Sequence, residues 1–232
     1  MAPSTFRIGF LLFPRLTQLD LTGPYEILAR APGAEMHLVA KSLDPVRSDR
    51  GLTIVPTTTI ATCPPLDVVC VPGGPGVNET LEDREILRFL RLTAKEARYV
   101  TSVCTGSLTL AAAGLLKGRR AACHWMSRDL LRRFGTEPLA ERVVIDGKFI
   151  TGSGVTAGID FALAVVAQVC GIETAEAIQL GVEYDPHPPF ESGTPEQAKP
   201  AVVDRVKQNA EPVMQAREAA VARAAAALDA RW

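Results

Sequence analysis

The feature that most constrains this chain is a regular alternation between short apolar runs and longer segments of helical periodicity. The apolar runs occupy residues 6–13, 36–40, 68–71 and 99–103. Apolar spacing of three to four residues predicts helices over residues 24–31, 83–97, 106–116, 127–134, 156–169 and 174–184. This alternation is typical of βαβ units, whose helices cover both faces of a mostly parallel sheet. We therefore predict an α/β fold, built as a three-layer sandwich.

Four other segments complete the predicted layout. Residues 48–60 carry β-branched side chains after a turn at Gly51, and residues 142–154 contain an Asp146-Gly147 pair, so both are predicted to be hairpins. Residues 183–200 are rich in proline and turn residues, which predicts an ordered surface excursion without helix or strand. Residues 202–232 predict a long amphipathic helix. We expect one α/β domain over residues 1–195 and a helical extension over residues 196–232 that packs on the domain or on a partner subunit.

Composition favours a small-molecule partner. The 25 lysines and arginines nearly match the 26 aspartates and glutamates, so no global charge favours nucleic acid or a membrane surface. The N-terminal apolar run is too short for a secretory signal or a membrane span, which predicts a cytoplasmic protein. The cysteines form no C-x-x-C pair and no zinc-ligand spacing, so we expect reduced thiols and no metal. They are Cys63, Cys70, Cys104, Cys123 and Cys170.

Cys104 is the first candidate for chemistry, because it lies between an apolar strand and a predicted helix in "SVCTGS". A sharp turn there would expose a nucleophile, with Gly106 permitting the turn and Ser107 permitting close packing. The first amide groups of the helix would favour a thiolate. A buried structural cysteine explains the local pattern equally well. The pattern alone leaves both interpretations open.

Three further positions have similar alternatives. Gly73 and Gly74 end the strand in "VVCVPGGPGV" and could offer N–H groups to an oxyanion, or simply form a turn. Asp20 precedes Thr22-Gly23-Pro24, where it could cap a helix, or could donate a proton from apolar surroundings. His124 could pair with the thiol, cap the helix near Ser127 or make a core hydrogen bond.

Taken together, the motifs resemble the DJ-1/PfpI superfamily, whose fold is similar to the class I glutamine amidotransferase (flavodoxin-like) domain. The resemblance covers residues 6–184 and rests, in order, on "IGFLLFP", "LDLTGPYEIL", "PLDVVCVPGG", "RYVTSVCTGSLTLAAAGLL", "RAACHW" and "ITGSGVTAGIDFAL". Asp20, "SVCTGS" and the later "EYDPHPPF" make the chain most similar to the members that hydrate isocyanides to N-substituted formamides. This resemblance implies a homodimer and a reaction without cofactor.

The resemblance also implies roles for individual residues. Cys104 would be the nucleophile, forming a covalent thioimidate, and Asp20 the proton shuttle. Thr105 and either Gly73 or Gly74 would supply N–H groups, while Val155 would line the pocket and His124 would have at most a minor role. The loop departs from the pattern of close relatives at Ser153 and Val155, where we would expect Gly and Ile. Two rivals remain: a glyoxalase or deglycase acting on α-oxoaldehydes, and a sensor domain related to those of AraC-type regulators.

Overall fold

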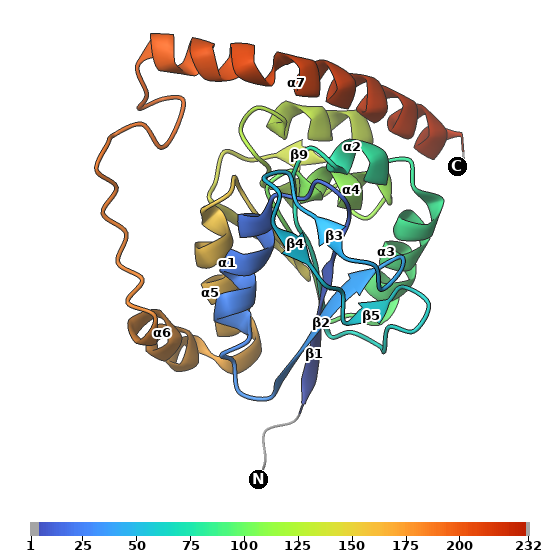
Figure 1. Cartoon of the computed structure of the whole chain (residues 1–232), viewed down its shortest axis with the longest axis vertical. Coiled ribbons are helices and arrows are strands. Elements are labelled where there is room, and N and C mark those ends of the chain that lie inside the picture. The colour runs from blue at the N-terminus through green and yellow to red at the C-terminus, as the bar shows by residue number, and fades with distance from the viewer. Residues whose placement is uncertain (1–4, 231–232) are drawn as a thin grey trace.

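A seven-stranded sheet forms the middle layer of the computed structural model, which describes residues 5–230 (Figure 1). The strands lie in the order β10-β11-β7-β6-β1-β2-β5, and in the described sheet every neighbouring pair except β10 and β11 is parallel. The predicted mostly parallel α/β sheet is therefore confirmed. Its strands are β1 (Phe6–Leu11), β2 (Ala34–Ala40), β5 (Thr58–Thr59), β6 (Val68–Val71), β7 (Tyr99–Val103), β10 (Val143–Asp146) and β11 (Phe149–Gly152).

Helices cover both faces of this sheet, as the three-layer prediction requires (Figure 1). On one face α1 packs against α5, and on the other α3 packs against α4. The helices are α1 (Gln18–Leu28), α2 (Val77–Thr80), α3 (Arg84–Glu96), α4 (Gly106–Ala112), the 3-10 helix η1 (Arg128–Phe134), α5 (Ala157–Cys170), α6 (Ile172–Gly181) and α7 (Pro200–Asp229).

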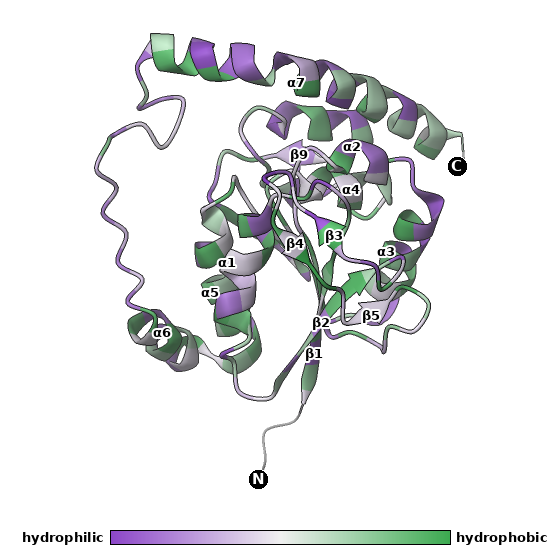
Figure 2. Ribbon diagram, in the orientation of Figure 1, coloured by the Kyte–Doolittle hydropathy of each residue, from purple (hydrophilic) through white to green (hydrophobic). Residues whose placement is uncertain are grey.

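The burial of the central strands explains why their sequences are continuous apolar runs. All four residues of β6 are buried, because helices shield both faces of a central parallel strand. Phe10 on β1, Leu110 on α4 and Phe161 on α5 are fully buried in one hydrophobic cluster. Figure 2 shows green, hydrophobic ribbon along β2, while α7 carries both hydrophobic and hydrophilic positions along its length.

The first helix differs from the prediction of a start at Pro24. It begins at Gln18 with Thr17 as the N-cap residue, and Pro24 lies inside it. Thr17 donates its backbone N–H to the carbonyl of Gly73, 2.9 Å away, so a contact from the turn after β6 holds the start of the helix. Proline lacks a backbone N–H and is therefore favoured in the first turn of a helix, where that N–H would have no partner within the helix. For this reason the sequence pattern suggested a helix start at Pro24. The predicted start was wrong, and Asp20 lies in the first turn.

Two other predicted helices change in length or type. The helix α4 ends at Ala112 instead of continuing to residue 116, because Gly114 has a φ of 78° and reverses the chain. The segment Arg128–Phe134 forms a 3-10 helix and ends at Gly135, which also has a left-handed conformation. Apolar spacing is similar in both helix types, so periodicity could not separate them.

Small strands complete the molecule. The first predicted hairpin, over residues 48–60, is confirmed only in part. The strand β4 (Thr53–Ile54) pairs antiparallel with β3 (Val46–Arg47), which precedes the predicted range, whereas β5 pairs in parallel with β2. The strand β5 is therefore not part of that hairpin. The second predicted hairpin is confirmed by the antiparallel pair β10 and β11. A separate parallel pair joins β8 (Arg120–Ala121) to β9 (Glu137–Pro138).

The C-terminal region runs around the body of the protein. Residues 183–199 contain neither helix nor strand, as predicted, and lead from α6 to the start of α7 (Figure 1). The helix α7 packs on α2, α4 and η1. The predicted range of residues 202–232 ends with two residues that lie outside the described part, and the boundary at residue 195 stays a prediction. Within residues 5–230, no helix has the length and apolarity to cross a membrane.

Candidate active site

The predicted site residues meet at the carboxyl edge of the sheet. Asp20 follows β1, Gly73 and Gly74 follow β6, and Cys104 follows β7, and these three strands are neighbours. The chain continues from β1 to β2 on one side and from β6 to β7 on the other, so the order of the strands reverses between β1 and β6. Open α/β sheets bind ligands at such a reversal point.

Cys104 has a strained backbone at this edge. Its φ is 59°, a left-handed conformation that is uncommon for residues other than glycine. Strain of this kind costs about 1–3 kcal/mol and persists only where the surroundings impose it. Here the N–H of Cys104 donates to the carbonyls of Gly152 and Ser153, both 3.0 Å away. The side chain, 5% exposed, therefore lies on a sharp turn between strand and helix, as a nucleophile would.

Close packing keeps this turn in place. A Cβ atom on Gly106 would lie 2.1 Å from the carbonyl oxygen of Val71, so a side chain there would displace the end of β6. Ser107 donates its hydroxyl to the carbonyl of Ala122, 2.6 Å away, and its Oγ lies 2.9 Å from that of Ser102. Small residues after Cys104 thus allow the helix to approach the sheet closely.

Asp20 is fully buried, and its carboxyl faces the turn that follows β6. Its Oδ2 accepts the N–H of Gly73 at 3.0 Å, while its Oδ1 is buried without a hydrogen-bond partner among the described residues. Burial raises the pKa of Asp20 to about 7, against the opposing effects of hydrogen bonds from Cys104 and Gly73, and the nearby charge of Asp49 adds to the rise. The capping interpretation is wrong, because Thr17 is the N-cap residue and the Asp20 side chain makes no cap bond.

The thiol of Cys104 and the carboxyl of Asp20 influence each other directly. Burial, the Asp20 carboxylate and Cys123 raise the pKa of Cys104 well above its usual value, whereas the backbone N–H of Thr105 lowers it. Two acids that share a buried site resist double ionisation. The pair therefore carries at most one negative charge near neutral pH.

The glycine turn after β6 supports both groups. Gly73 donates its N–H to Asp20, and Gly74 donates its N–H to Oγ1 of Thr105 at 3.0 Å. A Cβ atom on Gly73 would lie 2.5 Å from the Thr105 nitrogen and 2.9 Å from Oδ2 of Asp20, so only glycine fits without displacement. Both N–H groups are thus engaged by side chains of the site, and the role of either in holding an oxyanion stays a prediction.

His124 and the loop after β11 lie further along the same edge. Burial and the charge of Arg217 lower the pKa of His124 to about 4, so its ring is neutral at physiological pH. Its Nδ1 accepts the N–H of Met126 at 3.4 Å, and its carbonyl accepts the N–H of Ser127 at 2.9 Å. A Cβ atom on Gly154 would lie 2.6 Å from the His124 ring. The His124 ring thus contacts Met126, before η1, and Ser127 is the N-cap residue of that helix, so a cap bond from the His124 side chain is not formed; the role of His124 stays a prediction.

The two unusual loop residues have separate environments. Ser153 donates its hydroxyl to the carbonyl of Cys123 at 3.2 Å, linking the loop to the segment before His124. Val155 is half-buried and packs against the hydrophobic core. Cys123 itself is fully buried.

Two charged residues near the site belong to none of the motifs that the sequence offered. Asp49, in the hairpin of β3 and β4, accepts from Oγ1 of Thr17 at 3.4 Å and adds a negative charge near Asp20. Arg217, in the middle of α7, is 5% exposed and donates to the carbonyl of Gly74 at 3.0 Å. Its position among the buried residues Ala220, Val221 and Ala224 was the available signal, since a charge on an apolar helix face is unusual.

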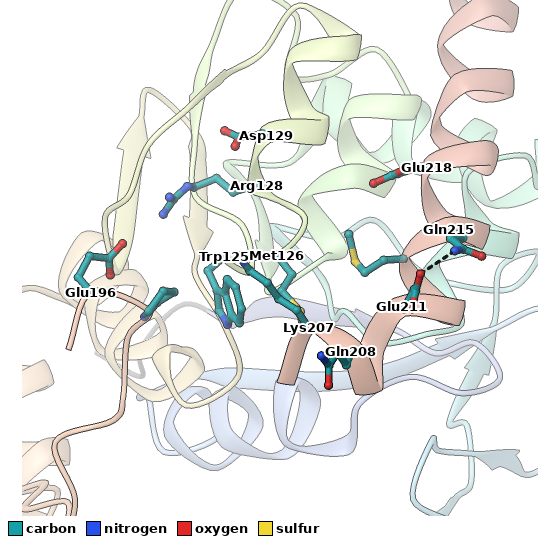
Figure 3. A pocket seen from close by; sticks show the side chains of 12 residues that line it. Trp125, Met126, Arg128, Asp129, Glu196, Lys207, Gln208, Glu211, Gln215 and Glu218 are labelled. Atoms are coloured by element: carbon teal, nitrogen blue, oxygen red, sulfur yellow. Dashed lines mark hydrogen bonds between the residues drawn. The ribbon is translucent and has the colours of Figure 1, made fainter. Parts of the chain in front are cut away.

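A cavity of about 630 Å³ opens between α7 and the segment after His124. Figure 3 shows Trp125 and Met126 facing Lys207, Gln208 and other residues of α7. Neither Cys104 nor Asp20 lines it. Within the described residues, no three His, Cys, Asp or Glu side chains are grouped to hold a metal ion.

Comparisons with known proteins agree with this geometry. The model of the DJ-1/PfpI family matches residues 6–168. An isonitrile hydratase from Pseudomonas putida is 54% identical over 225 residues, which cover 97% of this chain and 99% of that protein. The HTH-type transcriptional regulator GbdR from Pseudomonas aeruginosa is 34% identical over 186 residues, or 77% of this chain and 50% of the regulator. The crystal structure of a ThiJ/PfpI family protein from Pseudomonas syringae superposes with a TM-score of 0.91 at 44% identity, covering 94% of this chain and 91% of that one.

Proposed function

The chain belongs to the DJ-1/PfpI family, and from this premise and the geometry of the site we propose that it is an isonitrile hydratase. It would convert an isocyanide and water into an N-substituted formamide. The observation that carries the proposal is the buried pair of Cys104 and Asp20, at the reversal point of the sheet, in a chain 54% identical to the Pseudomonas putida hydratase over 97% of its length.

The first step adds the thiol across the terminal carbon of the isocyanide. The sulfur of Cys104 forms a bond to that carbon while Asp20, whose pKa is about 7, takes the thiol proton and passes it to the same carbon. The product is a thioimidate, in which the carbon carries one hydrogen, the sulfur and a double bond to nitrogen. No electron is gained or lost by the protein.

Water completes the reaction. It adds to the thioimidate carbon, giving its oxygen to carbon and one proton to the nitrogen through Asp20. The remaining hydroxyl proton returns to the carboxylate or the departing sulfur as the carbon–sulfur bond breaks and the formamide carbonyl forms. The unpartnered Oδ1 of Asp20 has a free lone pair for these transfers. The reaction uses no metal or organic cofactor.

The neighbouring residues support these steps. Thr105 donates its N–H to the sulfur of Cys104 and stabilises negative charge there. Gly73 orients Asp20 by its N–H, and Gly74 holds the Thr105 hydroxyl. Val155, on the loop beside the nucleophile, is proposed to line the pocket. His124 is neutral and turned to Met126, so its role is limited to shaping the loop.

We also propose that the protein is a cytoplasmic homodimer. The first half of α7 is largely exposed in a single chain, including Val206 at 39% and Val213 at 36%. A second subunit would cover these apolar residues. Sedimentation at micromolar concentration would show the dimer, and a monomer would contradict this part of the proposal.

The proposed activity is tested by supplying purified protein with aliphatic and aromatic isocyanides, and separately with methylglyoxal. Formamide production that disappears in the Cys104→Ala variant is the expected result. Turnover of methylglyoxal alone would instead assign a glyoxalase. Failure of both reactions, together with binding to a specific operator sequence, would support the sensor alternative.

A further inference from the structure

Arg217 occupies an unusual position for an arginine. It lies on α7, yet its residue exposure is only 5%. Its guanidinium donates three hydrogen bonds, each 3.0 Å long, to Oδ1 of Asn78, Oγ of Ser127 and the carbonyl of Gly74. The acceptors come from three separate regions of the chain, so this one side chain joins α7 to α2, η1 and the turn after β6.

All three of those acceptors are neutral. None of the ion pairs formed by the described side chains involves Arg217. Arg223, further along α7, shows the ordinary arrangement, because it is exposed and forms an ion pair with Glu82 at 2.8 Å. A buried charge is costly unless an opposite charge compensates it. The compensating charge for Arg217 must therefore lie beyond its direct hydrogen bonds.

The groups around Arg217 identify that charge. Burial lowers the pKa of Arg217, while Cys104, Cys123 and, more weakly, Glu79 raise it. Glu79 is mostly exposed and pairs with Arg15, which leaves its charge compensated by another residue. Arg217 also lowers the pKa of His124, which is neutral, and acts with Arg128 to oppose the rise in the pKa of buried Cys123.

Hydrogen bonds connect Arg217 to the reacting groups. It holds the carbonyl of Gly74, whose N–H is held by Thr105, the residue that follows Cys104. The preceding residue, Gly73, donates its N–H to Asp20. The glycine turn is thus fixed on one side by Arg217 and on the other by the site. A movement of α7 at this point would displace both Asp20 and Thr105.

We propose that Arg217 is a positioning residue that acts as counter-ion to the thiolate of Cys104, and that fixes the Gly73-Gly74 turn against Asp20 and Thr105. The proposal rests on the function proposed above and extends it to α7. Arg217 keeps its protons throughout the reaction and forms no bond to substrate. The C-terminal helix is then part of the catalytic apparatus, and not only a surface for a second subunit.

The decisive measurement does not require an isocyanide. The rate of Cys104 alkylation by iodoacetamide, followed by peptide mass spectrometry from about pH 6 to about pH 11, reports formation of the reactive thiolate. Arg217→Gln removes the charge but retains a hydrogen-bonding side chain. The midpoint of the alkylation profile is the pH at which half of Cys104 is present as thiolate. We expect this midpoint to move up by about one pH unit or more in Arg217→Gln, so alkylation at neutral pH should be at least about tenfold slower than in the unchanged protein.

Two further variants separate charge from geometry. Arg217→Lys retains the charge but cannot make the three bonds, so its midpoint should stay within about 0.3 pH unit while kcat for isocyanide hydration falls about tenfold or more. Arg223→Gln is the matched control on the same helix, and both its midpoint and its activity should equal those of the unchanged protein. If Arg217→Gln does not fold, Arg217→Lys alone tests the proposal, because its alkylation midpoint should stay unchanged while its kcat falls.

An unchanged midpoint in a folded Arg217→Gln protein would overturn the role as counter-ion. Full activity of Arg217→Lys would overturn the role in fixing the turn. If the unchanged protein fails to hydrate any isocyanide but the midpoint still moves in Arg217→Gln, the proposed function fails while the electrostatic role of Arg217 holds. The two proposals can therefore fail separately.

Discussion

Replacing Asp20 by asparagine should make the protein more stable and less active at alkaline pH. The carboxyl has an unfolded-state pKa near 3.8 and a folded-state pKa of about 7. Between these values the unfolded chain binds fewer protons than the folded one, so stability falls as pH rises through this window. Asparagine has nearly the same shape as protonated aspartate and does not titrate, so it avoids this loss.

The size of the effect follows from the shift in pKa. A rise from 3.8 to about 7 is roughly three units, and each unit is worth 1.36 kcal/mol, which gives a cost of about 4 kcal/mol for ionising buried Asp20. Near pH 4 the Asp20→Asn variant and the unchanged protein should have the same free energy of unfolding. Near pH 8 the free energy of unfolding of the variant should be larger by a few kcal/mol.

Urea unfolding at several pH values measures this difference. Asp83→Asn is a suitable control of opposite sign, because burial of Asp83 is outweighed by its hydrogen bonds to Lys41 and to the first amides of α3, which lower its pKa. The stability deficit of this variant relative to the unchanged protein should therefore grow as pH rises toward about 4 and stay constant above it. Formamide production by Asp20→Asn should fall about a hundredfold or more, since no carboxyl proton remains to transfer. A stability difference that is independent of pH would refute the assignment of a buried, largely protonated Asp20.

The other predictions concern single features of the site. Cys104→Ala should abolish turnover while its far-UV circular dichroism and unfolding midpoint stay close to those of the unchanged protein, and measurable formamide production in that variant would end the covalent mechanism. Gly73→Ala should cost about 1–3 kcal/mol in unfolding free energy and most of the activity, because the new Cβ would lie 2.5 Å from the Thr105 nitrogen; wild-type kinetics would show that the turn adapts freely. Dialysis against EDTA should leave the rate unchanged, and a loss restored by a divalent cation would contradict the cofactor-independent reaction.

Local patterns predicted most of the elements but not all of their limits. The strands β1, β6 and β7 were predictable because a strand covered on both faces must be apolar throughout. The start of α1 was not, because Thr17 is held by the carbonyl of Gly73, a residue distant in the sequence. The same contact explains why Asp20, which the sequence offered as a cap, points into the site.

The candidate site divides in the same way. The sequence by itself indicated a tight turn after Cys104, because small residues allow a strand to pass sharply into a helix, but it left the role of Cys104 open. It also determined the order of Asp20, the glycine turn and Cys104 along the chain. The tertiary structure alone decided how these groups are charged. The pKa of Asp20 depends on its burial and on Asp49, and the charged group that acts on Cys104 from α7 is Arg217, which lies far along the chain. Burial and electrostatic interaction act through space, so no local sequence pattern could specify them.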